Sequence, residues 1–334
     1  MYVRYCKVFI TLTILVNLLA CSTASDIDEI PSIDSNTETN LFINFLRGEI
    51  DLSFLDESLV NTLDLFLFNA HDGLKEAAHS ADESEDQSCI MSSSTGSKIL
   101  MGIANHNKET LANCQDVRQM QELSVDLHSQ YNGLLTMVGE KHIEIKGGYN
   151  QTELNLTRLV GKIILKKVTV EKPYNNGHIK VKRAFMMNVN TTSKLRGKTA
   201  SPEVSNPVYQ GYTEHASFYL SFLSADIKII GNNKENLCHF YVFENTSETN
   251  PTVLFIEAEY KQQQGNKTTL VYYPIVIKNE GKNAVLRNNA YTLSAKIRRP
   301  GTTQPEIGNQ VGDLEVSVAV EDWMDTEEQD QFIE

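Results

Sequence analysis

The hydrophobic and polar positions of this chain form short apolar segments separated by turn residues. Most segments are rich in Val, Ile, Phe and Tyr and alternate with a period near two, which is typical of half-buried β-strands. The clearest are residues 41–46, 63–68, 99–104, 143–145, 154–170, 240–243, 253–260, 270–277, 291–297 and 314–320. This pattern predicts a mostly β protein, and two β-sandwiches would use all of these strands.

One segment has a helical period instead. Between Lys108 and His128, apolar residues recur every three or four positions without Pro or Gly: Leu111, Cys114, Val117, Met120, Leu123 and Leu127. Such spacing predicts an amphipathic helix. We therefore expect one short helix in the N-terminal domain, with its apolar stripe packed against its own sheet.

The length of 334 residues favours two domains, because single cores rarely grow so large. Pro173 and the following Tyr174-Asn175-Asn176-Gly177 form a turn cluster near the middle of the chain. We predict an N-terminal sandwich over residues 48–172 and a C-terminal sandwich over residues 173–334. A turn cluster of this kind can also join two strands of one domain.

Charge excludes one class of partner. The chain has 43 acidic and 30 basic side chains and a formal net charge of −13. Because this charge repels phosphate backbones, nucleic acid is not expected as a partner. The share of hydrophobic residues, 41%, is that of an ordinary globular protein rather than of a disordered chain or a membrane bundle.

No residue pattern points to catalysis or to a bound metal. The cysteines Cys89, Cys114 and Cys238 lack zinc-ligand spacing and allow at most one disulfide. The chain has no HExxH, GxSxG or phosphate-loop motif. His239 follows Cys238 directly and would face the opposite side of a strand, so the two cannot act as base and nucleophile. We expect no enzyme, no catalytic residues, no metal and no cofactor.

The N-terminus has the pattern of an export signal. In residues 1–20, Arg4 and Lys7 precede an apolar run that is too short for a stable membrane anchor. The run ends in Leu18-Leu19-Ala20-Cys21, which resembles a bacterial lipobox, where the cysteine is acylated and becomes the new N-terminus. Residues 21–47 are predicted to be a polar tether followed by a first strand.

Motifs in the C-terminal third carry a family resemblance. They are Phe240-Tyr-Val-Phe-Glu-Asn245, Tyr272-Tyr-Pro-Ile-Val-Ile277, Arg287-Asn-Asn-Ala-Tyr291, Arg299-Pro-Gly-Thr302 and Leu314-Glu-Val-Ser-Val-Ala-Val-Glu-Asp-Trp323. In this order and spacing they resemble the fimbrillin family, the major stalk subunits of type V pili of Bacteroidales bacteria. Leu63–Asn69, Lys98–Asn105 and Leu156–Ile163 are similar to further strands of the family.

The resemblance implies two transthyretin-like or Ig-like β-sandwiches with a structural role in a fimbria that supports adhesion. The family is exported as an outer-membrane lipoprotein precursor and trimmed at the cell surface by an arginine-specific protease, which removes the first strand. A C-terminal donor strand of a neighbouring subunit then fills the groove and builds an extracellular fibre. The implied partners are copies of the chain, related pilus subunits, the protease and, transiently, the outer membrane.

The removable strand and the cleavage residue can be assigned in this sequence. Leu41, Ile43 and Phe45 share one strand face, and Arg47 and Gly48 follow where a turn can be reached by a protease. The expected donor is the last strand, in which Leu314, Val316, Val318 and Val320 alternate before Trp323. The acidic residues after Trp323 depart from an apolar donor, and Phe332 and Ile333 are possible extra contacts.

Two other functions are compatible with the same features. An anchor or tip subunit of the same pilus would share the fold but lack the protease site or the donor strand. A carbohydrate-binding surface lipoprotein would need exposed aromatic platforms, for which Tyr209, Tyr212, Tyr272 and Tyr273 are candidates. Tyrosines in strands are more often packing residues, which favours the fimbrial interpretation.

Overall fold

The computed structural model describes residues 39–46, 57, 59–82, 88–131, 134–195, 207–208, 224–227, 237–262, 267–305 and 314–323. The predicted signal peptide, the predicted lipidation residue Cys21 and the predicted cleavage residues Arg47 and Gly48 lie outside these ranges. In the described part of the chain, no helix is both long enough and apolar enough to cross a membrane.

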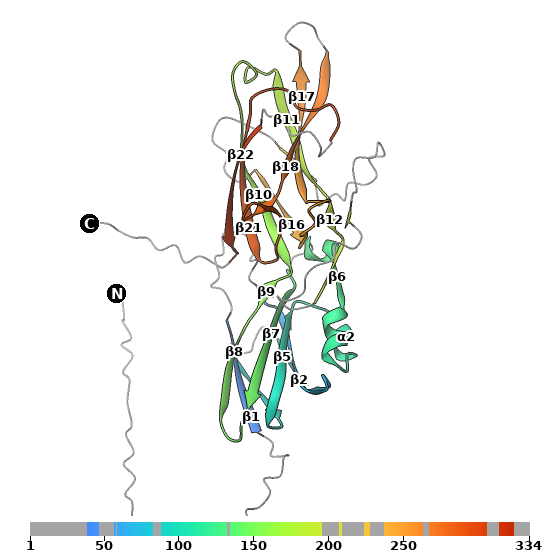
Figure 1. The fold of residues 1–334 in the computed structure, drawn as a ribbon, viewed down its shortest axis with the longest axis vertical. Helices are drawn as coiled ribbons and strands as arrows, with labels where there is room; N and C mark the ends of the chain where they lie inside the picture. The colour runs from blue at the N-terminus through green and yellow to red at the C-terminus, as the bar shows by residue number, and fades with distance from the viewer. Residues whose placement is uncertain are drawn as a thin grey trace, which may run out of the picture. The chain divides into compact units, whose positions relative to one another are not determined.

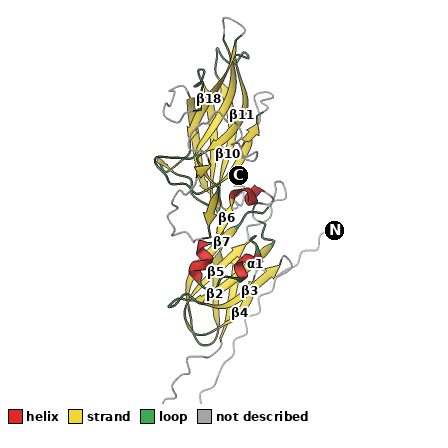
Figure 2. Ribbon diagram, turned by 90° about the vertical axis from the view of Figure 1, so that its right-hand side faces the viewer, coloured by secondary structure: helices red, strands yellow, loops and turns green. Residues whose placement is uncertain are grey.

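Two sheets enclose the N-terminal core (Figures 1 and 2). A five-stranded sheet has the order β3-β2-β5-β7-β9, and a three-stranded sheet has the order β4-β1-β8. The core between them contains Leu41 and Ile43 from one sheet and Leu63, Leu65 and Leu67 from the other. The strands are β1 (Thr39–Leu46), β2 (Thr62–Asn69), β3 (Lys75–Asp82), β4 (Ser88–Ser93), β5 (Gly96–Ala104), β7 (Met137–Ile145), β8 (Asn150–Asn155) and β9 (Thr157–Arg158).

The structure divides the helix that was predicted between Lys108 and His128. It contains α1 (Lys108–Ala112) and α2 (Val117–Glu122), followed by β6 (Ser124–Asp126) and a 3₁₀ helix η1 (Leu127–Tyr131). The side chains of Asn107 and Asp116 accept hydrogen bonds from backbone N–H groups at the two helix starts. Because the second cap begins a new helix while the apolar period continues, periodicity alone did not reveal the break.

The apolar stripe of this helical segment is buried, as the periodicity predicts. Leu111 and Met120 are fully buried and belong to the same core cluster as Phe66, Phe68 and Met101. These residues lie on the face of β2 and β5 that points away from β1, because neighbouring residues of a strand face opposite sides. Figure 2 shows the helices in red beside these strands.

Two four-stranded sheets form the C-terminal sandwich. One has the order β16-β10-β21-β22, with β10 (Val160–Val170), β16 (Cys238–Phe243), β21 (Asn289–Ile297) and β22 (Leu314–Asp322). The other has the order β15-β11-β17-β18, with β11 (Ile179–Met187), β15 (Ser224–Asp226), β17 (Val253–Lys261) and β18 (Thr268–Val276). Their buried faces meet through side chains such as Ile163, Phe240, Leu293, Ile256 and Tyr273.

Three short pairs of strands complete the described structure. β12 (Val189–Asn190) pairs with β14 (Pro207–Val208), β13 (Thr192–Lys194) pairs with β6, and β19 (Lys278–Asn279) pairs with β20 (Lys282–Asn283). The chain passes from the first pair of large sheets to the second between β9 and β10. This point precedes the turn at residues 173–177 that suggested the domain boundary.

The mostly β architecture with two sandwiches is confirmed. Each of the segments with a two-residue apolar period lies in one or more strands, and the long segment 154–170 spans the end of β8, all of β9 and β10. Strands β3, β4, β11 and β15 of the large sheets were not among the predicted ones. All four are nevertheless paired: β3 with β2, β4 with β1, and β11 with both β17 and β15.

Candidate functional site

The first described strand, β1, is the middle strand of the three-stranded sheet. It pairs antiparallel with β4, where Leu41 lies opposite Met91 and Ile43 opposite Cys89. On its other side it pairs parallel with β8, where Phe45 lies opposite Leu154. Since both of its edges are hydrogen-bonded, removal of β1 would leave unpaired backbone groups on β4 and on β8.

The inward side chains of β1 are deeply buried. Leu41 is 2% exposed and Ile43 is 0% exposed. Both pack in a core with Met91 and Leu154 from the neighbouring strands. At roughly 1.5 to 3 kcal/mol for each fully buried large aliphatic side chain, their loss would remove several kcal/mol of stabilisation. Leu41 and Ile43 are two of the three residues that were predicted to share the inward face of the first strand, and we call the apolar space that they occupy the trough. The side chain of the third residue, Phe45, lies outside the described part of the structure.

The facing five-stranded sheet forms the floor of this trough, with Leu63, Leu65 and Leu67 of β2 and Leu100 of β5. Two floor positions are glycines for a steric reason. A Cβ at Gly102 would overlap the side chain of Leu154, and a Cβ at Gly139 would overlap the backbone oxygen of Asn155. These close approaches bring β8 down onto the floor and fix the depth of the trough under β1.

The predicted donor strand, β22, is an outer strand of its sheet. It pairs antiparallel with β21, from Leu314 opposite Ile297 to Asp322 opposite Asn289. Leu314, Val316 and Val320 are half-buried and pack against the main core. Val318 is 37% exposed. Figure 1 shows β22 in dark red alongside β21. An outer strand has one hydrogen-bonded neighbour, whereas a central strand such as β21 has two.

A polar and aromatic cluster surrounds Trp323 at the end of β22. We call it the Trp323 cluster; its members are Glu57, Arg158, Lys162, Tyr241 and Trp323. The backbone N–H of Trp323 donates to Asn288 O at 2.8 Å, and its ring stacks on Tyr241 at 5.9 Å between centroids. Arg158 Nη1 donates to Trp323 O at 2.8 Å and its guanidinium lies 4.6 Å from the indole.

Glu57 joins this cluster to the segment that follows β1. Its carboxylate accepts hydrogen bonds from Lys162 Nζ at 2.7 Å and from the Tyr241 hydroxyl. Its backbone oxygen accepts a bond from Arg158 Nε at 3.1 Å. Burial, together with the hydrogen bond and charge of Glu57, raises the pKa of Tyr241, so that its hydroxyl stays protonated as the donor.

Sequence reasoning identified Trp323 but missed its partners. Arg158 and Lys162 fall within a segment that resembles the family, yet no local spacing assigned them a role. Their contacts with Glu57 and Trp323 join residues 101 to 165 positions apart. Alternation along single strands carries no signal for contacts across such distances, so only the folded arrangement reveals them.

Two of the four tyrosines that could form a carbohydrate platform are buried. Tyr272 is 6% exposed and Tyr273 is 3% exposed, and the Tyr273 hydroxyl donates to Arg299 O at 3.0 Å. Tyr209 and Tyr212 lie outside the described residues. The platform reading is therefore wrong for Tyr272 and Tyr273.

Neither disulfides nor metal clusters occur among the described residues. Cys89, Cys114 and Cys238 are thiols. Within the described ranges, no three His, Cys, Asp or Glu side chains are grouped so as to hold an ion. Burial raises the pKa of the Cys238 thiol to about 12, and lowers the pKa of the neighbouring His239, so both are neutral near pH 7.

Solved structures share this fold. A candidate cell adhesion protein from Bacteroides eggerthii is similar with 20% identity and a TM-score of 0.68, over 86% of this chain and 96% of that one. A fimbrilin from Porphyromonas gingivalis is similar with 19% identity and a TM-score of 0.65, over 88% and 99%. The tip fimbrial protein Mfa3 of the same species gives 15% identity and a TM-score of 0.55, over 86% and 100%.

The family is identified by sequence. No curated protein matches the chain. The family model for the C-terminal domain of FimA-like major fimbrial subunit proteins matches residues 154–323. This range includes β10, β21, β22 and Trp323, and it contains the C-terminal motifs that carried the resemblance. Such subunits are structural, which agrees with the prediction that the chain is not an enzyme. The chain therefore belongs to the FimA-like major fimbrial subunit family.

Proposed function

We propose that this chain is the stalk subunit of a fimbria and polymerises by strand exchange. In this account β1 is a placeholder that fills the trough until it is removed, and β22 of a neighbouring subunit then takes its place. Each subunit gives one strand and receives one, so the contact is head-to-tail and does not close, which produces a filament.

The observation that carries this proposal is the position of β1. β1 is hydrogen-bonded on both edges, and its inward residues Leu41 and Ile43 are buried in the trough. Loss of the strand exposes apolar surface and two unpaired edges at once. Addition of an extended segment with alternating apolar residues satisfies both requirements.

The sequence of β22 fits the trough. Its apolar residues Leu314, Val316, Val318 and Val320 alternate, as Leu41, Ile43 and Phe45 do in β1. It is also an outer strand, so that its departure leaves a single neighbouring strand unpaired. These features support β22, with Trp323 near its end, as the donor.

Export and trimming complete the proposed cycle. The lipobox at Cys21 supports delivery as an outer-membrane lipoprotein precursor, and membership in a fimbrial family supports a final place in extracellular fimbriae. Arg47 follows β1 directly, so cleavage between Arg47 and Gly48 by an arginine-specific protease would separate the whole strand from the rest of the subunit.

Electron microscopy of protein treated with an arginine-specific protease tests the proposal. The treated wild-type protein should form fibres. The Arg47→Ala variant should remain monomeric, and a variant that ends at Gly312 should be trimmed but form no fibres. Fibres from Arg47→Ala, or from the shortened variant, would contradict the assigned cleavage residue or the assigned donor.

The same experiment separates a stalk from an anchor or tip subunit. A tip protein such as Mfa3 shares the fold, so the architecture alone does not distinguish these roles. A subunit that is trimmed normally but adds only to the end of preformed fibres, without polymerising by itself, would be an anchor or tip. Self-polymerisation is expected only of the stalk.

A further inference from the structure

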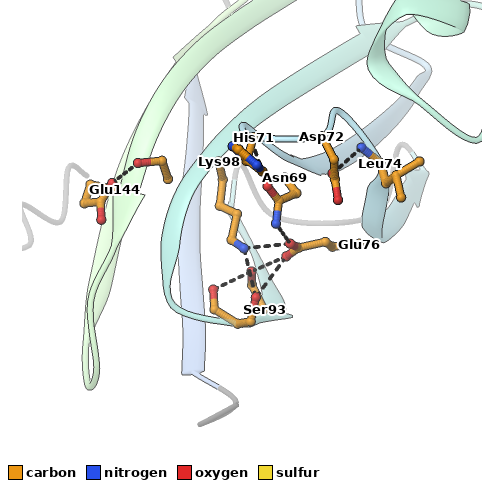
Figure 3. Close-up of polar contacts among 10 residues, drawn as sticks. Asn69, His71, Asp72, Leu74, Glu76, Ser93, Lys98 and Glu144 are labelled. Carbon is orange, nitrogen blue, oxygen red and sulfur yellow. Dashed lines mark hydrogen bonds and ion pairs between the residues drawn. The ribbon is translucent and has the colours of Figure 1, made fainter. Parts of the chain in front are cut away.

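A lysine, an asparagine and a glutamate converge where β2 ends and where β3 and β5 begin (Figure 3). Lys98 of β5 and Asn69 of β2 are direct partners across the two strands. They lie two residues beyond Leu100 and Leu67, which face the trough, so their side chains face the same side. Glu76 of β3 lies beside them.

Lys98 and Asn69 both donate hydrogen bonds to one carboxylate oxygen of Glu76. Lys98 Nζ donates to Glu76 Oε1 at 2.7 Å, and Asn69 Nδ2 donates to the same oxygen at 3.0 Å. Lys98 is 2% exposed, whereas the Glu76 side chain is 22% exposed. Lys98 Nζ also donates to Ser94 Oγ at 2.8 Å, and the hydroxyls of Ser93 and Ser94 each donate to Glu76 Oε2 at 3.3 Å.

We propose that Lys98 and Asn69 become joined by an intramolecular isopeptide bond, with Glu76 as the group that transfers protons. Glu76 contacts both of the other side chains, and Lys98 and Asn69 are register partners. Lys98 carries the amine nucleophile, and Asn69 carries the amide carbon that is attacked. Adjacent partners on one sheet face have Cβ atoms about 5 Å apart, within reach of a lysine side chain.

Glu76 is ionised and lies beside both reacting groups. Burial raises the pKa of Glu76, but hydrogen bonds from Lys98 and Asn69 and the charge of Lys98 lower it more, so the carboxylate is ionised at neutral pH and has a free lone pair for a proton only while the reaction proceeds. Asn69 Oδ1 accepts a hydrogen bond from the backbone N–H of His71 at 2.8 Å. This donor polarises the carbonyl and stabilises the negative charge that develops on the oxygen during attack.

The reaction balances without any other reagent. The Lys98 ammonium gives a proton to Glu76, and the neutral Nζ attacks Cγ of Asn69 to form the new C–N bond. Glu76 passes this proton to Nδ2 as the old C–N bond breaks, and ammonia leaves. The remaining extra proton on Nζ moves to ammonia, so that one ammonium ion is released and nothing is oxidised or reduced.

The position of the bond gives it a structural role. Ser93, which contacts Glu76, lies opposite Thr39 at the start of β1. A covalent link between β2 and β5 there would hold the floor strands of the trough in register while the trough stands empty. The ion pair between Lys182 and Glu259 differs from that between Lys98 and Glu76. Its side chains are 40% and 37% exposed, so water competes with the contacts between them.

Intact mass measurement of the folded chain tests the proposal. The wild-type protein should be lighter than its sequence by the mass of one ammonia molecule. Trypsin should no longer cleave after Lys98, and fragments containing Asn69 and Lys98 should migrate as one branched peptide. Lys98→Arg and Glu76→Gln, which keep the size of the side chain, should both have the full sequence mass.

The control variant is Lys141→Arg, since Lys141 is an exposed lysine of β7 that donates to a backbone oxygen. It should lose ammonia as the wild type does. Full sequence mass and normal cleavage after Lys98 in the folded wild type would overturn the proposal. Loss of ammonia that persists in Lys98→Arg would overturn it too, because cyclisation at Asn132-Gly133 or Asn176-Gly177 would then be the source.

Discussion

Asn245 illustrates how single residues give the C-terminal motifs their form. It is 1% exposed, and its Nδ2 group donates to the backbone oxygens of Asn188 and Asn250 and to Thr252 Oγ1. One amide thus holds together three segments around the end of β16. The motif that ends in Asn245 was visible in the sequence, but these partners became visible only in the fold.

The requirement for glycine at position 301 also has a local cause. A Cβ at this position would overlap the backbone oxygen of Tyr272, to which Thr302 N donates at 3.1 Å. Gly301→Ala should therefore push the turn away from β18 and lower the free energy of unfolding by about 1 to 3 kcal/mol. Chemical denaturation measures this. Gly147→Ala, where the new Cβ meets nothing within 4 Å, is the control. Equal stability of the two variants would contradict the steric explanation.

Glu57 stabilises the Trp323 cluster through its carboxylate. Its side chain and that of Lys162 are 16% and 18% exposed, so Glu57→Ala leaves a largely buried ammonium and the Tyr241 hydroxyl without their acceptor. The expected loss in free energy of unfolding is roughly 1.5 to 3 kcal/mol. Glu122→Ala, which breaks a pair with side chains 47% and 38% exposed, should cost less than about 1 kcal/mol. Similar losses in both variants would show that the Trp323 cluster contributes little.

At the scale of whole elements, the predictable strands are those with one buried face. Strand β21, with buried Tyr291, Leu293, Ala295 and Ile297 alternating, matches its sequence pattern directly. Strand β3 reads KEAAHSAD and offers no apolar alternation, because it is an outer strand that gains its place by pairing with β2. Such a strand is specified by its neighbour rather than by its own residues.

The exchange of β1 can be followed by one native thiol. Cys89 lies opposite Ile43 and is 7% exposed. In a chain that begins at Gly48 and ends at Gly312, which lacks both β1 and the donor, Cys89 should react with a thiol reagent almost as fast as in denatured protein. In the untrimmed chain it should react slowly. Cys114 is 5% exposed and is distant from Cys89 in the sequence, so it should react slowly with the thiol reagent in both chains.

Mass spectrometry of labelled peptides provides the rates for each cysteine. Cys238 serves as a second internal reference, because its pKa of about 12 leaves almost no thiolate at pH 8. If Cys89 stays protected when β1 and β22 are both absent, the trough closes by itself and is not a binding site for a donor strand. If Cys114 becomes reactive as well, the N-terminal sandwich has unfolded as a whole.

At the scale of the whole molecule, export is a separate prediction that rests on the lipobox. Cys21→Ala should abolish acylation and surface delivery, because in a lipobox the cysteine thiol is the group that is acylated. The soluble protein should still fold, since residues 39 to 323 contain the described sheets. Labelling of cells with a radioactive fatty acid measures acylation. Continued labelling of the Cys21→Ala variant would contradict the assignment.

Features that depend on neighbouring residues could be predicted from the sequence, whereas features that join residues of different strands could not. The two sandwiches, the first strand and the last strand all follow from alternating apolar residues. The Trp323 cluster and the group of Asn69, Glu76 and Lys98 do not, since their members come from different strands and contribute one polar residue each. Polar contacts of this kind have no period, and they are found only after the strands have been placed.

If β22 of one subunit occupies the trough of another, a disulfide trap should detect the contact. Val316, Val318 and Val320 are each replaced by Cys, the protein is trimmed and oxidised, and non-reducing electrophoresis detects links between subunits. At least one of these variants should form a ladder through native Cys89. Ser317→Cys, facing the other way, and any variant combined with Cys89→Ser should form none. Fibres in which none of the three positions links to Cys89, or in which Ser317→Cys links equally well, would contradict the account.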